Sequence, residues 1–282
     1  MLAVLALIHA DHLPGQPICT IQDVQNALAG HATIDRGWWE ALKSIRTIVV
    51  TTKEEIVGVA SYGIRKVDDS EFAGCGFILW LHAQENREVT EAIVSHIHTS
   101  LQHCPHIYAF WIATPLTLGV EALPIERRPV MHQVLLKSGF IGEDDWLYMK
   151  GLPLTQQPNR GRHTEIERIK DGWKVFMYEG HERIAEAEIG LGRDHIGVLW
   201  WIEVQEPWRG QGLGKQLLLQ ARKILGDAGA HTIILYVDHD DGTERNRIPA
   251  IQLYQSQSFI VVDHLWSYKK SISLPDHLSP HS

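Results

Sequence analysis

Apolar and polar residues alternate along the C-terminal half of the chain in a pattern that predicts strands followed by a helix. The predicted strands cover Trp173–Tyr178, Arg183–Gly190 and Val198–Val204. Leucines and alanines then recur every three or four residues from Leu213 to Leu225, which predicts one amphipathic helix. Glycines beyond Leu225 end it.

The remaining pattern predicts a strand at His231–Asp238, a helix from Pro249 to about Ser256, and two short strands after it. The N-terminal half repeats this order of elements. We expect two further helices to precede it, near Thr20–Ala29 and Asp35–Ser44. The apolar start, Met1–Ile8, lacks a basic leader and is interpreted as a strand.

Two pairs of matching segments, each about 120 residues apart, indicate an internal repeat. Gly139–Asp144 resembles Ser258–Asp263, and Leu81–Glu85 resembles Ile202–Glu206. The expected fold class is therefore α/β (α+β), with two mixed-sheet domains in tandem. The predicted boundaries are residues 1–151 for the first domain, 152–163 for a linker, 164–273 for the second domain and 274–282 for a flexible tail.

Composition narrows the classes of function. The 282 residues allow two modest domains, and the net charge of -8 argues against nucleic-acid and anionic-membrane partners. No apolar run approaches the roughly 20 residues that span a bilayer. The three cysteines form no CxxC pair, which favours a reducing compartment, and we expect a cytoplasmic protein. No group of residues has the spacing of a metal site, so we expect no metal.

The run Arg209-Gly210-Gln211-Gly212-Leu213-Gly214-Lys215 lies between a predicted strand and the helix that it opens. Glycines let the backbone approach a ligand closely, and the N–H groups at a helix N-terminus bind anions. The flanking Arg209 and Lys215 add positive charge. This arrangement predicts a phosphate or pyrophosphate site, although its spacing fits neither the P-loop nor the dinucleotide fingerprint.

A third phosphate motif fits. Val204-Gln205-Glu206-Pro207 precedes Arg209-x-x-Gly212-x-Gly214, and a later segment contains Asn246, Ala250, Leu253-Tyr254 and Ser258-Phe259. In these segments the second half resembles the GNAT superfamily of acyl-CoA-dependent N-acyltransferases. Asn246 stands one residue further from Ala250 than in the family's pattern, and Ser258 replaces the common glycine.

The resemblance implies an N-acetyltransferase that uses acetyl-CoA as cosubstrate and an amine of a small molecule or protein as acceptor. It places the coenzyme's pyrophosphate on the amides from Gln211 to Lys215 and the pantetheine arm along Ile202 to Val204. The Val204 N–H would then stabilise the oxyanion of the thioester. The implied coenzyme-binding residues are Ile202, Val204, Arg209, Gly210, Gln211, Gly212, Leu213, Gly214, Lys215 and Asn246.

The resemblance also assigns the catalytic roles. Tyr254 matches the family's tyrosine acid, which protonates the departing thiolate. Glu203 is the first candidate for the base that deprotonates the amine, and Asp238, Glu188 and a water relay stay open as alternatives. A non-enzymatic acyl-CoA-binding or sensing module is the competing class of function.

The first copy lacks these residues. Glu88–Ile93 stands where the second copy has its glycine run, and the two glutamates of this segment would repel a pyrophosphate. Leu135 stands in the place of Tyr254. We therefore expect the first copy to be a degenerate, structural domain, with Trp38, Trp39 and Trp111 as candidates for a wall of the acceptor site.

Overall fold

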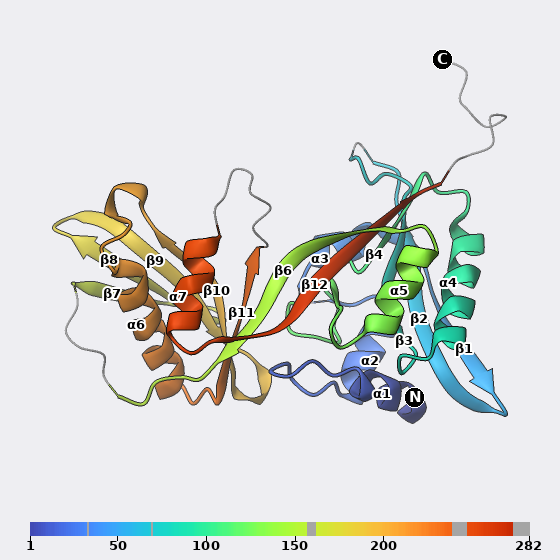
Figure 1. The fold of residues 1–282 in the computed structure, drawn as a ribbon, viewed down its shortest axis with the longest axis horizontal. Coiled ribbons are helices and arrows are strands. Elements are labelled where there is room, and N and C mark those ends of the chain that lie inside the picture. Colours follow the sequence, from blue (N-terminus) through green and yellow to red (C-terminus); the bar gives the residue numbers. More distant parts are fainter. Residues whose placement is uncertain (33, 69, 157–161, 239–246, 273–282) are drawn as a thin grey trace, which may run out of the picture. The chain divides into compact units, whose positions relative to one another are not determined.

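The structure is a computed structural model that describes residues 1–282 except 33, 69, 157–161, 239–246 and 273–282 (Figure 1). The chain forms two compact units. Unit 1 consists of Met1–Leu13, Ile18–Asp145 and the described residues from His264 onward. Unit 2 consists of Pro14–Pro17 and Trp146–Asp263. Both units combine helices with a mixed sheet, which confirms the predicted fold class.

The first half of the chain contains α1 (Leu2–Ala10), α2 (Ile21–Leu28), α3 (Arg36–Ala41), β1 (Leu42–Thr52), β2 (Glu55–Arg65), β3 (Gly76–His82), α4 (Arg87–Leu101), β4 (His106–Ala109), β5 (Leu123–Pro124), α5 (Pro129–Lys137) and β6 (Ile141–Gly151). The second half contains β7 (Thr164–Ile169), β8 (Gly172–Glu179), β9 (Glu182–Leu191), the short 3₁₀ helix η1 (Arg193–His195), β10 (Ile196–Val204), a second 3₁₀ helix η2 (Glu206–Trp208), α6 (Leu213–Asp227), β11 (Thr232–Asp238), α7 (Ile248–Ser256) and β12 (Ile260–Ser271).

The two units share one topology, as the sequence repeat predicts. Strands follow the order β1-β2-β3-β4-β12-β6 in unit 1 and β7-β8-β9-β10-β11-β6 in unit 2. In each unit, two neighbouring strands precede and follow a long helix, and they are the third and fourth strands of unit 1 and the fourth and fifth of unit 2. They run parallel, β3 with β4 across α4 and β10 with β11 across α6. A helical crossover of this kind is what a parallel pair requires.

The final strand of each copy continues beyond its own unit. Residues 146–151 of β6 pair with β11 in unit 2, and residues 268–271 of β12 pair with β4 in unit 1. The compact units therefore differ from the contiguous ranges 1–151 and 164–273 that the repeat indicates. Pairing between strands so distant in sequence leaves no local signal in the chain.

The cores differ between the units. Unit 1 has one core cluster that includes residues of α1, α2 and α3, and another that includes residues of α4 and α5. The adjacent residues Phe77 and Ile78 of β3 belong to different clusters, so the two cores lie on opposite faces of the strand. Unit 2 has a single cluster, to which both α6 and α7 contribute. Figure 1 shows these two helices against the sheet of unit 2. The other face of its sheet is covered by neither helix.

The strand predicted at Met1–Ile8 is wrong, because these residues begin α1. Val4, Leu7 and Ile8 are buried at helical spacing against the core of unit 1. Leucine and alanine favour helix, and a uniformly apolar run has no periodicity that separates a buried helix from a buried strand.

The other predicted elements of the second half are present, with two differences. The two short strands expected after α7 form one long strand, β12. The edge strand β7 was not predicted, because its residues are mostly polar and exposed. The three tryptophans proposed as a wall lie within unit 1: Trp39 is buried in a core, and Trp38 and Trp111 pack against it.

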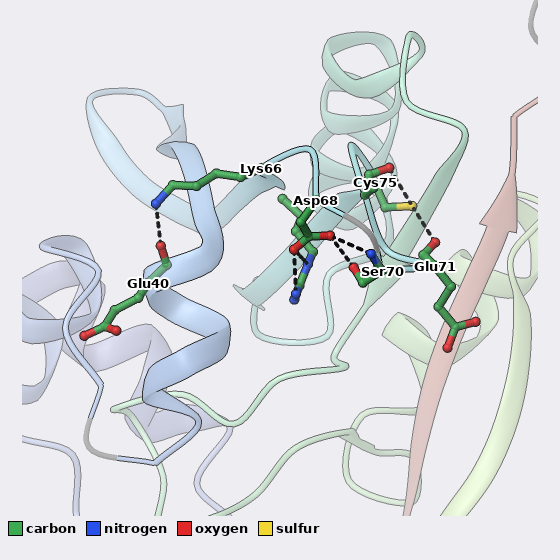
Figure 2. Close-up of polar contacts among 8 residues, drawn as sticks. Glu40, Lys66, Asp68, Ser70, Glu71 and Cys75 are labelled. Atoms are coloured by element: carbon green, nitrogen blue, oxygen red, sulfur yellow. Dashed lines mark hydrogen bonds and ion pairs between the residues drawn. The ribbon is translucent and has the colours of Figure 1, made fainter.

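Polar contacts shape the connection between β2 and β3 in unit 1 (Figure 2). The Asp68 carboxylate accepts hydrogen bonds from the backbone and side chain of Ser70 and from the Arg65 guanidinium. Lys66 donates to the Glu40 carbonyl at the end of α3. These hydrogen bonds provide partners for the polar groups of Asp68, Ser70 and Lys66 in this connection.

No helix in the described part of the chain is long and apolar enough to cross a membrane.

Candidate active site

The centre of the candidate site is the place where β10 and β11 separate. Their parallel pairing runs from Ile196 with Thr232 to Leu199 with Leu235 and then stops, although β10 continues to Val204 and β11 to Asp238. The register between β10 and β9 shifts between Leu199 and Trp201, which bends β10 at this point. Among the described residues, the separation leaves one backbone edge of β10 with no strand beside it, at the residues predicted to bind pantetheine.

The glycine run adopts the geometry of an open anion-binding loop. Gly210 and Gly212 both have φ of 76°, and Gly212 is the N-cap of α6, where no side chain caps the helix. A Cβ at Gly210 or Gly212 would meet no atom within 4 Å. A side chain would therefore fit at either position. Glycine is favoured there because the positive φ is strained for other residues. The first N–H groups of a helix have no partner within it, and where no side chain caps them they can bind an anion.

The loop is tied to the end of β10 and to α7. Arg209 donates from Nε to the Val204 carbonyl at 3.0 Å. A Cβ at Gly214 would lie 3.3 Å from a methyl of Leu253 and 3.8 Å from a methyl of Val204. Val204, the glycine loop and the α7 residue next to Tyr254 therefore lie together.

The other predicted coenzyme-binding residues have defined places. Gln211 and Lys215 are exposed around the loop, whereas Leu213 is buried in the core and anchors α6. Ile202 packs its side chain against the same core, so its backbone is what it offers to a ligand. Asn246 lies outside the described residues.

Tyr254 on α7 is 5% exposed and packs against Phe259 with ring centroids 5.9 Å apart. Burial raises the pKa of the Tyr254 phenol well above its usual range, and the nearby Arg247 offsets only part of this rise. The phenol therefore stays protonated at neutral pH, as a proton donor must be. Among the described residues its hydroxyl has no hydrogen-bond partner.

The carboxylates considered for the base differ in their partners. Asp238 forms an ion pair with Arg247, and Glu188 lies 3.4 Å from the Lys174 ammonium. Glu203 is exposed and forms no ion pair or side-chain hydrogen bond among the described residues. Of these three carboxylates, Glu203 is therefore the one without an ion pair among the described residues.

Glu203 belongs to an acidic face that local sequence reasoning missed. Across the antiparallel strands the register aligns Glu165 with Phe176, Phe176 with Glu186, and Glu186 with Glu203. The next row aligns Glu167, Lys174, Glu188 and Trp201. Directly opposed residues share one face of a sheet.

This face is the one that α6 and α7 leave uncovered. The intervening residues Val175, Met177, Ala185 and Ala187 belong to the core on the helix side. The adjacent Trp200 and Trp201 are 44% and 46% exposed at the bend of β10. This face carries five glutamates, of which Glu186 is paired with Arg183 and Glu188 with Lys174. Together with the two exposed tryptophans, the carboxylates are suited to contact a cation with an apolar body.

The corresponding place in unit 1 is filled by the protein itself. Pairing of β3 with β4 stops at Ile78 and Ala109, where β4 ends, whereas β3 continues to His82. There Arg128 donates from Nη2 to the Leu81 carbonyl at 2.6 Å and forms an ion pair with Asp11 at 3.3 Å. His82 lies 2.8 Å from the same Asp11 carboxylate.

The first turn of α4 also differs from that of α6. The Asn86 side chain caps it by accepting from the Val89 N–H. Glu88 lies in this first turn, at the end of the helix where α6 has its uncapped glycine loop. That unit 1 does not bind the coenzyme stays a prediction, for which the filled gap and the capped helix are structural grounds.

Residues 146–259 match the family model described as Acetyltransferase (GNAT) family. Mycothiol acetyltransferase from Thermobifida fusca (strain YX) is 30% identical over 157 residues, which are 48% of this chain and 46% of that protein. Its counterpart from Nocardiopsis dassonvillei is 27% identical over 160 residues, 49% of this chain and 46% of that protein. The chain thus spans about half the length of these curated relatives.

Two solved structures have the same fold over nearly the whole chain. A tandem GNAT protein from the clavulanic acid biosynthesis pathway gives a TM-score of 0.62 at 11% identity, covering 97% of this chain and 95% of that one. A GCN5-related N-acetyltransferase from Sphaerobacter thermophilus gives 0.59 at 13% identity, covering 96% and 92%. At these identities the likeness concerns the fold, and it extends over both copies.

Proposed function

Because residues 146–259 belong to the acetyltransferase (GNAT) family, we propose that unit 2 transfers an acetyl group from acetyl-CoA to an amine. One observation carries the proposal: an uncapped glycine loop at the N-terminus of α6 lies beside the free edge of a strand. The loop offers N–H groups to the pyrophosphate, and the strand edge offers hydrogen bonds to the amide groups of pantetheine.

The reaction needs one nucleophilic attack, the loss of two protons from the acceptor nitrogen (one before the attack and one after it) and the protonation of the departing sulfur. Glu203, directly or through a water, takes a proton from the ammonium of the acceptor. The free amine then attacks the thioester carbon, so that a C–N bond forms and the C–S bond breaks. The Val204 N–H stabilises the negative charge on the carbonyl oxygen. Tyr254 gives its proton to the departing sulfur, and the resulting phenolate regains a proton, through water, from the nitrogen that has attacked. Most of the acceleration comes from orientation.

The acidic face supports an amine as the acceptor. An alkyl amine is a cation at neutral pH, and Glu186, Glu188 and Glu203 lie on the face from which it would approach. Trp201, in the same row as Glu188, offers an aromatic surface to the carbon skeleton or to the charge itself. The coenzyme would enter from the side of α6, so the two substrates meet where β10 and β11 separate.

Amine-dependent release of free CoA thiol tests the proposal directly. Purified protein is mixed with acetyl-CoA and a panel of amines that includes the acceptor of mycothiol acetyltransferases, and products are identified by mass spectrometry. We expect saturable CoA release with at least one amine and an acetylated product. Binding of acetyl-CoA without transfer to any amine would refute the enzyme and favour a coenzyme-binding module.

A further inference from the structure

A segment from the start of the chain is built into unit 2. Pro14–Pro17 lies between α1 and α2 in sequence but belongs to the compact unit that contains β6 and β11. Gln16 is only 5% exposed and donates from Nε2 to the Tyr236 hydroxyl at 2.9 Å. The Tyr148 hydroxyl in turn donates to the Pro14 carbonyl at 3.1 Å.

The fit of this segment is close. Gly15 has φ of 92°, and a Cβ there would lie 2.9 Å from the Tyr148 hydroxyl and 3.0 Å from an Ile234 methyl. No larger residue is accommodated without displacing them, and the flanking Pro14 and Pro17 restrict the backbone further. The segment thus holds the Gln16 amide in one place.

Tyr236 stands at the point where β11 leaves β10. It follows Leu235, the last residue of β11 that pairs with β10. It alternates with Leu235 and Val237, which belong to the core beneath α6, so its ring lies on the opposite face, the face of Glu203. The ring is half-buried and lies 5.4 Å from that of Tyr148, its pairing partner on β6.

We propose that Tyr236 contacts the acceptor amine and that Gln16 is its positioning residue. This inference rests on the proposed function of unit 2. The phenol oxygen has more than one acceptor site, so it can receive an N–H of the amine while it receives the Gln16 amide. Tyr236 and Glu203 then address the amine from the two strands that border the gap. A hydrogen bond from a rigid, buried side chain keeps the phenol at the distance that attack on the thioester requires.

A double-mutant cycle on Gln16→Leu and Tyr236→Phe tests the proposal, with kcat/KM for the acceptor measured at saturating acetyl-CoA. Each single change is expected to lower this value about five- to tenfold, the factor that corresponds to one net hydrogen bond. The double variant should be no worse than Tyr236→Phe alone, because Gln16 acts through the hydroxyl. Acetyl-CoA affinity, measured by calorimetry, should stay within about twofold of wild type.

Gln22→Leu is the matched control, since Gln22 is an exposed glutamine whose amide bonds to Asn26. It should leave all rates unchanged. If the losses of kcat/KM from Gln16→Leu and Tyr236→Phe were additive in the double variant of an active protein, this inference would be overturned and the proposed function would stand. A wild-type protein that binds acetyl-CoA but acetylates no amine would overturn the proposed function together with it. Gln16→Glu keeps the shape without the N–H donor, and it should lose as much as Gln16→Leu if donation is what matters.

Discussion

Gly212→Glu is the sharpest test of the coenzyme loop. Unit 2 offers a matched control, Gly180→Glu, at a glycine that also has a positive φ and open space around it. Gly212 has φ of 76° and Gly180, in the turn between β8 and β9, has φ of 59°. A Cβ at either position would meet no atom within 4 Å. Both substitutions therefore add the same charge and the same left-handed strain of roughly 1–2 kcal/mol, without a steric clash.

The two variants should differ in coenzyme binding. A carboxylate at about 6 Å from a pyrophosphate, at an effective dielectric constant of about 40, repels each phosphate charge by roughly 1.4 kcal/mol. Two such charges give about 3 kcal/mol, or roughly a 100-fold weaker Kd, for Gly212→Glu. Gly180→Glu should bind acetyl-CoA as wild type does. Gly212→Gln, equal in size but uncharged, separates the charge from the bulk.

Calorimetric titration of acetyl-CoA measures these affinities, and thermal melting of each variant verifies that it is folded. A folded Gly212→Glu with the affinity of Gly180→Glu would refute the assignment of the loop. Two binding sites in the wild type would refute the expectation that unit 1 has lost the coenzyme.

The remaining predictions concern the proton transfers and the filled gap of unit 1. Tyr254→Phe should lower kcat at least about 100-fold and leave the affinity for acetyl-CoA, measured by calorimetry, unchanged, because only a proton donor is lost. A kcat equal to that of wild type would show that Tyr254 is not the acid. Glu203→Gln should lower kcat/KM at neutral pH, and activity should recover as rising pH deprotonates the amine. Glu188→Gln, which removes a carboxylate of the same face that is paired with Lys174, should raise the KM for the acceptor but leave kcat within about twofold; equal losses of kcat from both would point to general charge instead of a base. Arg128→Met should destabilise the protein by about 3–5 kcal/mol in urea unfolding, since it leaves the buried Asp11 without its main cation. Burial raises the pKa of Asp11, but Arg128 and His82 outweigh this effect and hold the pKa below its usual value. The contribution of the pair to the free energy of unfolding should therefore be present above the unfolded pKa near 4 and be lost as pH falls through the folded pKa. If stability fell with acid in Arg128→Met just as it does in wild type, this account would be contradicted.

Local chemistry accounts for the parts of the site that the sequence predicts well. The glycine run, the helix that it opens and the strand before it lie within about 30 residues of one another, and each has its own signal of turn, period or alternation. The fold class followed from the same signals, read twice along the chain. Tyr254 came from a resemblance of motif, and its burial next to Phe259 is a fact that only the structure supplies.

Long-range pairing accounts for what was missed. Gln16 and Tyr236 are separated by 220 positions, and no pattern in either segment indicates the other. The acidic face depends on the register of four strands, since a shift by one residue would move Glu186 and Glu188 into the core. The start of the chain was assigned to the wrong class because a short apolar run carries no period.

The contrast between the two gaps shows how one fold can hold a binding site and its filled counterpart. In the repeat, Arg128 of unit 1 corresponds to Arg247 of unit 2, each just before the helix that follows the gap. Arg128 reaches the Leu81 carbonyl on the separated strand and is neutralised by Asp11 from α1. Arg247 is instead paired with Asp238 at the end of β11 itself. Arg247 has its counter-ion on β11 and not on the edge of β10. On that edge Arg209 bonds to the Val204 carbonyl, so in our proposal the Ile202 backbone and the Val204 N–H are the groups left for a ligand. In unit 1 the Arg128 guanidinium gives the strand a hydrogen bond at the Leu81 carbonyl. In our proposal the coenzyme takes the corresponding place beside β10 in unit 2.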